Sequence, residues 1–227
     1  MSWTAVVLAG SRGAADPVAR ASGVSHKAFA EIAGKPMIAH VLDTLAAAPS
    51  IGGIVVVIER SSPELPRPDA RRIDAARSPS LSALAGFEAA GAPVLVTTAD
   101  HPLLTVEMVE HFIAAAAASG VDVAAGVALR PVVEQAGSTA RRTYLRFRDG
   151  EVSGCNLFAL MTPRARAALT YWRLLEAKRK HPWRRVLMVV LFMAAAAASG
   201  VAVAAGVARG PFGEQADRRR AAPICGS

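Results

Sequence analysis

Three short apolar runs follow one another in the first hundred residues of the chain. They are TAVVLA (4–9), GIVVVIE (53–59) and PVLVTTA (93–99). Each run is continuous rather than alternating, which is typical of strands that are buried on both faces of a sheet. The runs therefore predict three strands of a parallel sheet.

Helical segments separate these runs and follow the last of them, at residues 36–48, 80–91 and 105–120. Pro36 suits a first helical position, Thr105 an N-cap, and Gly91 and Gly120 helix ends. The β-α-β-α-β-α order predicts an α/β fold, with a doubly wound, mostly parallel sheet between two layers of helices. In such folds ligands bind at the carboxyl ends of the strands.

Three further segments predict a loop, a hairpin and a helix. Residues 60–79 are rich in proline and arginine and predict a surface loop. Residues 142–160 predict a hairpin that turns at Asp149–Gly150. Residues 163–183 predict a basic helix with Trp172 and Leu175 on its apolar face.

Composition and charge restrict the classes of protein to which the chain can belong. The 227 residues are 52% hydrophobic and contain two cysteines, which are too few for a disulfide framework. The start, MSWTAVVLAG, lacks the features of a signal peptide, so we expect a cytoplasmic protein. The net charge of +8 is concentrated after residue 140, yet no nucleic-acid-binding motif accompanies it. We therefore expect no nucleic-acid partner.

The turn after the first apolar run, LAGSRG (8–13), is the first candidate for a phosphate-binding loop. It lacks the third glycine of the dinucleotide-binding fingerprint, and no G-K-[ST] follows as in a P-loop. Neither of these two nucleotide-binding motifs fits the turn.

A series of motifs fits better: LAGSRG (8–13), HKAFAEIAGKPMIAHVLDTL (26–45), SPSLSALAGFEAA (78–90) and TTADHPLLT (97–105). In this order they resemble the MobA-like NTP transferase family, which includes molybdenum cofactor guanylyltransferases and cytidylyltransferases. The resemblance covers about residues 4–185. It implies a GT-A-like, Rossmann-like three-layer α/β/α fold in a domain of residues 1–185. It also implies a nucleotidyltransferase that moves an NMP group from an NTP, with CTP or GTP favoured, to a phosphorylated or hydroxyl small-molecule acceptor and releases pyrophosphate.

The resemblance also implies which residues form the site. The candidates are Leu8, Ala9, Gly10, Ser80 and Ser82 at the nucleotide, Arg12 and Lys27 at the triphosphate, Asp100 as a Mg²⁺ ligand, and Gly154 and Asn156 at the acceptor. Cations at the triphosphate would neutralise charge on the departing pyrophosphate, and a carboxylate suits Mg²⁺.

Simpler interpretations of these residues remain. Gly10 and Gly13 are consistent with a tight turn alone, and Lys27 and Arg20 with solvated charges. Asp100 could cap the following helix, and Asn156 could be a structural residue of a strand. Either Arg12 or Arg20 could be the phosphate-side arginine, because the span from Gly10 to Lys27 is longer than is common in the family.

The C-terminal part departs from the family pattern. Residues 108–136 recur at 188–216 with 21 of 29 positions identical, where the family carries a second metal-ligand motif. We therefore assign residues 186–227 to an atypical segment, either an extra helix-strand unit or a membrane-associated tail. Residues 186–208 contain no charge and follow a basic flank, so a span with the N-terminal domain in the cytoplasm is one interpretation. The alternative function is a catalytically impaired nucleotide-binding protein of the same fold.

Overall fold

The structure is a computed structural model of the chain. It describes residues 2–11, 16–135, 144–147, 150–177 and 203–207. The strands are β1 (Trp3–Leu8), β2 (Glu31–Ile32), β3 (Lys35–Pro36), β4 (Ile51–Ile58), β5 (Arg71–Asp74), β6 (Val94–Thr98), β7 (Val123–Leu129), β8 (Leu145–Phe147), β9 (Gly150–Leu160) and β10 (Val203–Val207). The helices are α1 (Pro17–Ala21), the short 3₁₀ helix η2 (Lys27–Phe29), α2 (Met37–Ala47), α3 (Pro79–Ala90), α4 (Val106–Ala118), α5 (Arg130–Gln135) and α6 (Ala165–Ala177).

The central sheet is mostly parallel and has the strand order β10-β7-β9-β6-β1-β4-β5, with β8 paired to β9. The three predicted apolar strands, β4, β1 and β6, pair in parallel at its centre. β9 runs antiparallel to both of its neighbours, β6 and β7. The prediction of an α/β fold with a mostly parallel sheet is confirmed.

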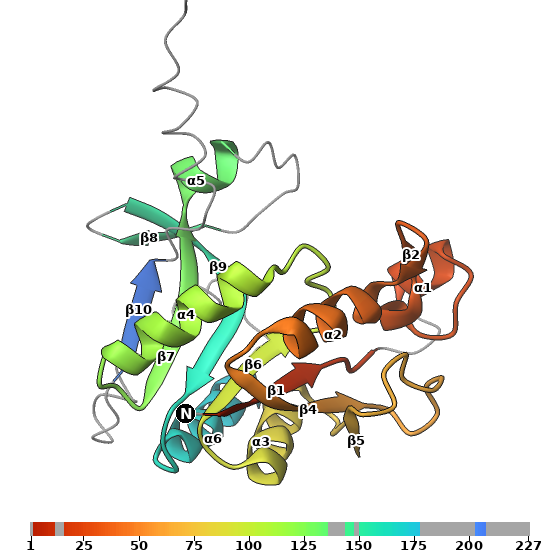
Figure 1. Cartoon of the computed structure of the whole chain (residues 1–227), viewed down its shortest axis with the longest axis horizontal. Coiled ribbons are helices and arrows are strands. Elements are labelled where there is room, and N and C mark those ends of the chain that lie inside the picture. The colour runs from red at the N-terminus through yellow and green to blue at the C-terminus, as the bar shows by residue number, and fades with distance from the viewer. Residues whose placement is uncertain (1, 12–15, 136–143, 148–149, 178–202, 208–227) are drawn as a thin grey trace, which may run out of the picture.

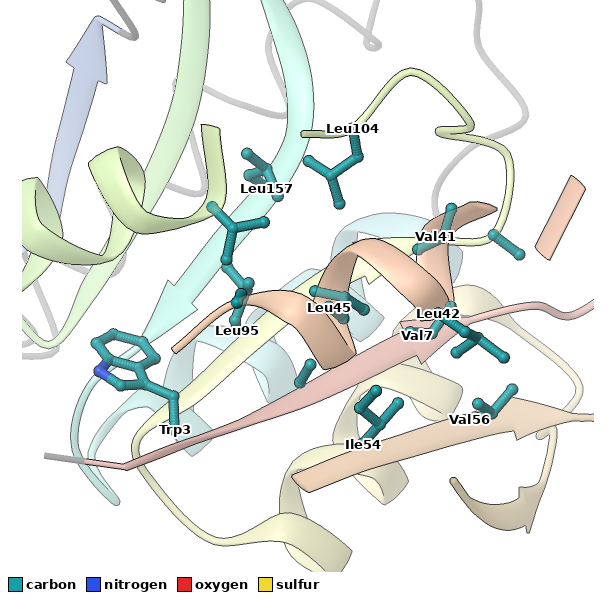
Figure 2. Close-up of a cluster of buried hydrophobic side chains, with 14 of the residues drawn as sticks. Trp3, Val7, Val41, Leu42, Leu45, Ile54, Val56, Leu95, Leu104 and Leu157 are labelled. Atoms are coloured by element: carbon teal, nitrogen blue, oxygen red, sulfur yellow. The ribbon is translucent and has the colours of Figure 1, made fainter. Parts of the chain in front are cut away.

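Helices cover both faces of the sheet, which gives three layers (Figure 1). On one face α2 and α4 bury Leu42, Leu45 and Phe112 against β1, β4 and β6. Figure 2 shows part of this cluster, including Trp3 and Leu95. On the other face α3 and α6 bury Phe87 and Leu169. Because successive strand residues point to opposite faces, continuous apolar strands supply both cores.

The predicted helix boundaries agree with the structure in most places. Thr105 caps α4 through a hydrogen bond from the Met108 N–H, and Gly91 follows α3 with a φ of 73°. Pro36 is the N-cap of α2 rather than its first residue, a shift of one position. The predicted loop at 60–79 contains β5, which was missed because this strand at the sheet edge has no apolar run.

The hairpin and the last predicted helix are also present. β8 and β9 pair antiparallel, and their pairing ends at Phe147 and Gly150, beside the predicted turn. α6 begins at Ala165, and Trp172 packs against the α3–α6 core as predicted. The side chain of Leu175 lies outside the described residues.

The second copy of the repeat supplies β10. This strand pairs in parallel with β7, and each residue from Val203 to Val207 faces its own copy 80 positions earlier. In Figure 1 β10 accordingly lies beside β7. Most of the uncharged run 186–208 lies outside the described residues. Within the described part of the chain, no helix has the length and apolar character that a membrane span requires.

Candidate active site

The loops after β1, β4 and β6 lie side by side at the carboxyl ends of these strands, because the strands are parallel neighbours. This end of the strands is called the carboxyl edge of the sheet. Two backbone hydrogen bonds tie the strand ends together, from the Ala9 N–H to the Val57 carbonyl and from the Ala99 N–H to the Leu8 carbonyl. Gly10 and Asp100 follow these bonded residues directly, so the structure brings the predicted nucleotide loop and the predicted metal ligand to the same edge.

Gly10 is exposed at this edge, beyond the buried Ala9. A Cβ atom built at Gly10 would lie 3.7 Å from Glu59 Oε1 and 3.9 Å from Ala75 Cβ, which are ordinary contacts. Packing within the protein therefore does not require a glycine here. A ligand that approaches the backbone closely would require one.

Lys27 and Asp100 form an ion pair at the same edge. Lys27 Nζ lies 3.0 Å from Asp100 Oδ2, and the two side chains are 25% and 43% exposed. Burial tends to raise the pKa of Asp100, but the Thr98 hydroxyl and the Lys27 ammonium stabilise the carboxylate more, so its pKa lies below the ordinary 3.8. Asp100 is therefore ionised at neutral pH and available to a cation.

Glu59, which follows β4, lies between the loop after β1 and the segment that carries Lys27. Its Oε1 accepts a hydrogen bond from the Ser11 N–H at 2.8 Å, and its Oε2 lies 2.8 Å from His26 Nε2. Burial tends to raise the pKa of Glu59, but the hydrogen bonds from Ser11 and His26 lower it below the ordinary 4.5. Sequence reasoning missed this residue, although its place at the end of a predicted parallel strand was a usable signal.

Ser80 and Ser82 lie in the first turn of α3, as predicted, but both side chains are buried at 0% and 5% exposure. The Ser80 N–H donates to Glu176 Oε2 at 3.2 Å, and the Ser80 hydroxyl donates to the same oxygen. The Ser82 hydroxyl accepts from the Ala76 N–H at 3.0 Å. A carboxylate from α6 thus binds the donors at the start of α3.

Gly154 and Asn156 lie on β9 beside an irregularity in the β7–β9 register. Asn156 is exposed and has a φ of 53°, a left-handed conformation that asparagine tolerates better than most residues. The last pair of the β6–β9 ladder is Val96 with Phe158, so Asn156 lies two residues beyond the paired part of these strands.

The structure describes less of two predicted parts of the site, the arginine of the loop after β1 and the metal ligands. Arg12 and Gly13 lie outside the described residues. In the described part of the chain no group of three or more His, Cys, Asp or Glu side chains is arranged to hold a metal ion.

Comparison with known proteins identifies the family. The MobA-like NTP transferase domain matches the chain over residues 5–214. The chain belongs to the MobA-like NTP transferase family. Like the other members of this family, it is a nucleotidyltransferase that uses an NTP.

Solved structures resemble this MobA-like NTP transferase over most of its length. A hypothetical transferase from Thermus thermophilus is 29% identical with a TM-score of 0.74, and the alignment covers 93% of this chain and 95% of that one. The 2-C-methyl-D-erythritol 4-phosphate cytidylyltransferase from the same organism is 16% identical with a TM-score of 0.58, covering 92% and 90%.

A third relative has a bound nucleotide. The CMP:2-keto-3-deoxy-manno-octonic acid synthetase complexed with CTP is 15% identical with a TM-score of 0.60, covering 97% of this chain and 98% of its own. At this identity the likeness concerns the fold, which confirms the GT-A-like architecture of the MobA-like NTP transferase. A search of curated proteins finds no match.

Proposed function

We propose that this MobA-like NTP transferase moves an NMP group from CTP or GTP to a phosphorylated or hydroxyl small-molecule acceptor, with Mg²⁺ and release of pyrophosphate. The observation that carries the proposal is the Lys27–Asp100 pair beside the Gly10–Ser11 loop, at the carboxyl edge of the sheet. This edge is where open α/β sheets bind their ligands.

The bond changes follow from the family's reaction. An acceptor oxygen attacks the α-phosphorus of the NTP, and the bond from that phosphorus to the oxygen bridging to the β-phosphate breaks. Pyrophosphate leaves with the electron pair of that bond. Lys27 and Arg12 are the cations assigned to the triphosphate, where they would neutralise the growing charge, so positioning and electrostatic stabilisation account for catalysis.

The remaining candidates are assigned by the resemblance of their motifs to those of the family. The backbone of Leu8, Ala9 and Gly10 would contact the base and ribose. Ser80 and Ser82 are 0% and 5% exposed, so the start of α3 would contact the nucleotide only if the Ser80 donors were released from Glu176. Gly154 and Asn156 would contact the acceptor. CTP is supported by the fold shared with a CTP-bound synthetase, and GTP by the guanylyltransferases of the resembled family.

The donor set fits a Mg²⁺ ion that is held mainly by substrate. Asp100 offers one ionised carboxylate, and Mg²⁺ commonly binds one or two carboxylates together with phosphate oxygens and water. When bound, the ion would neutralise phosphate charge. Lys27 would then exchange its contact with Asp100 for one with the triphosphate.

Pyrophosphate release tests this function. We expect release with CTP or GTP, Mg²⁺ and a panel of phosphorylated and hydroxyl acceptors, and a loss of kcat of at least about 100-fold in Asp100→Asn. Asp43→Asn is the matched control, because Asp43 also pairs with a lysine, Lys35 at 2.7 Å, on the exposed surface. Full activity in Asp100→Asn would contradict the proposal. Binding of nucleotide without turnover would instead support the impaired, nucleotide-binding alternative.

A further inference from the structure

Two separate segments of the nucleotide site depend on one carboxylate. The loop after β1 contains Ser11, and the short helix η2 begins at Lys27 directly after His26. Glu59 Oε1 accepts from the Ser11 N–H, while Glu59 Oε2 contacts His26 Nε2. Ser11 and Glu59 are 48 positions apart in the chain, and His26 and Glu59 are 33 apart, so the contacts are long-range.

We propose that Glu59 is a positioning residue of the nucleotide site, which holds the Gly10–Ser11 loop and Lys27 in one fixed arrangement. Its role presupposes the nucleotidyltransferase reaction proposed above. Glu59 itself is held firmly, because it directly follows Ile58, a fully buried residue of β4, and β4 pairs with β1.

The contacts of His26 fix the direction of the hydrogen bonds. His26 is 4% exposed, and its Nδ1 accepts a hydrogen bond from the Ala28 N–H at 3.2 Å. Because Nδ1 accepts, the imidazole proton lies on Nε2, and Nε2–H donates to Glu59. The same histidine therefore caps η2 and connects its start to Glu59.

Glu59 consequently faces two donors, the Ser11 N–H and the His26 Nε2–H. An ionised carboxylate accepts both, because each oxygen is an acceptor. A glutamine has one acceptor oxygen and directs its amide N–H groups at the second donor, so it can keep only one of the two contacts.

The contacts of Glu59 with His26 also determine where Lys27 lies. Its Nζ reaches Asp100 at the end of β6, while the residue before it is held by Glu59 at the end of β4. The backbone at Lys27 is thus held beside the end of β4 while its Nζ lies at the end of β6, and these two strands flank β1. Loosening His26 would displace Lys27 from the phosphates, and catalysis is sensitive to displacements of about 1 Å.

Steady-state kinetics of Glu59→Gln test the role. We expect kcat/KM for the NTP to fall about 10- to 100-fold, with KM for the acceptor unchanged, because only the nucleotide side is displaced. Glu88→Gln is the matched control: Glu88 pairs with Arg166 on the exposed α3–α6 surface, so kcat/KM should not change. Unchanged kcat/KM in Glu59→Gln would overturn the inference.

Nitrogen NMR of the unsubstituted protein supplies a test that does not depend on turnover or on the folding of a variant. We expect a protonated, pyrrole-type Nε2 and an unprotonated Nδ1 for His26, and an Nδ1-protonated ring would overturn the inference. A chain that releases no pyrophosphate with any NTP would contradict the proposed function alone, and this NMR result would still test the His26–Glu59 hydrogen bond on which the inference rests.

Discussion

Lys27 and Asp100 lie 73 positions apart in the chain yet form an ion pair. The sequence could predict both as site candidates, because a motif carries each and Asp100 follows a recognisable buried strand. The end of the predicted strand at 53–59 was also a signal for Glu59, but nothing in the sequence pointed to Glu176 as the partner of Ser80. The Ser80–Glu176 contact joins residues 96 positions apart on two helices, and no local pattern encodes such a contact.

Asn156 allows a residue-scale prediction that separates conformation from chemistry. Its φ of 53° suits glycine, whereas alanine pays about 1 kcal/mol in the left-handed region. We expect Asn156→Gly to keep the stability of the protein and Asn156→Ala to lose about 1 kcal/mol in thermal or chemical denaturation.

The same two variants test the proposed role of Asn156 at the acceptor. Both remove the side-chain amide, so both should raise KM for the acceptor by a similar factor while KM for the NTP stays constant. If the stable Asn156→Gly variant keeps the KM for the acceptor, the amide has no role in acceptor binding.

The strands that could be predicted from sequence are those with a continuous, mostly buried apolar run. β1, β4 and β6 are continuous apolar runs at the centre of the sheet. β5 contains two arginines and an aspartate in four residues and lies at the sheet edge, so it has no comparable pattern. The missed strand thus reflects its position at an edge, where burial on both faces is not required.

α3 packs closely against the sheet because of one glycine, which gives an element-scale prediction. A Cβ atom at Gly86 would overlap Val6 Cγ1 and lie 3.1 Å from Val57 Cγ2. Although alanine favours helices, we expect Gly86→Ala to cost about 1–3 kcal/mol, because overpacking displaces α3 from β1 and β4.

The free energy of unfolding in urea measures this loss. Gly53→Ala is the control, because a Cβ there would meet only Thr4 at 4.0 Å, so no comparable loss is expected. A Gly86→Ala variant as stable as the parent would show that the contact between α3 and the sheet adjusts freely.

At the scale of the whole molecule, the sequence did not determine the structure of the C-terminal segment. Both an added strand and a membrane span were consistent with residues 186–208. The described strand β10 takes Val203–Val207 from that run into the central sheet. Residues 186–202 lie outside the described residues.

Membrane fractionation follows as the whole-molecule prediction. We expect the full chain to be released into the supernatant when membranes are washed with alkaline carbonate, because β10 commits part of the apolar run to the sheet. A fraction that resists the wash would contradict this prediction and support the membrane-anchored interpretation of residues 186–208.

The pairing of β10 with its own copy also bears on how the chain folds. β7 and β10 share the sequence VAAGV and pair in parallel, residue by residue. The two strands differ in length, because β7 continues to Leu129 whereas the described β10 ends at Val207. Ala128 and Leu129, which lie past the shared sequence, pair with Ser153 and Val152 of β9. The residues that follow the shared sequence, rather than the shared sequence itself, therefore favour β7 over β10 as the neighbour of β9.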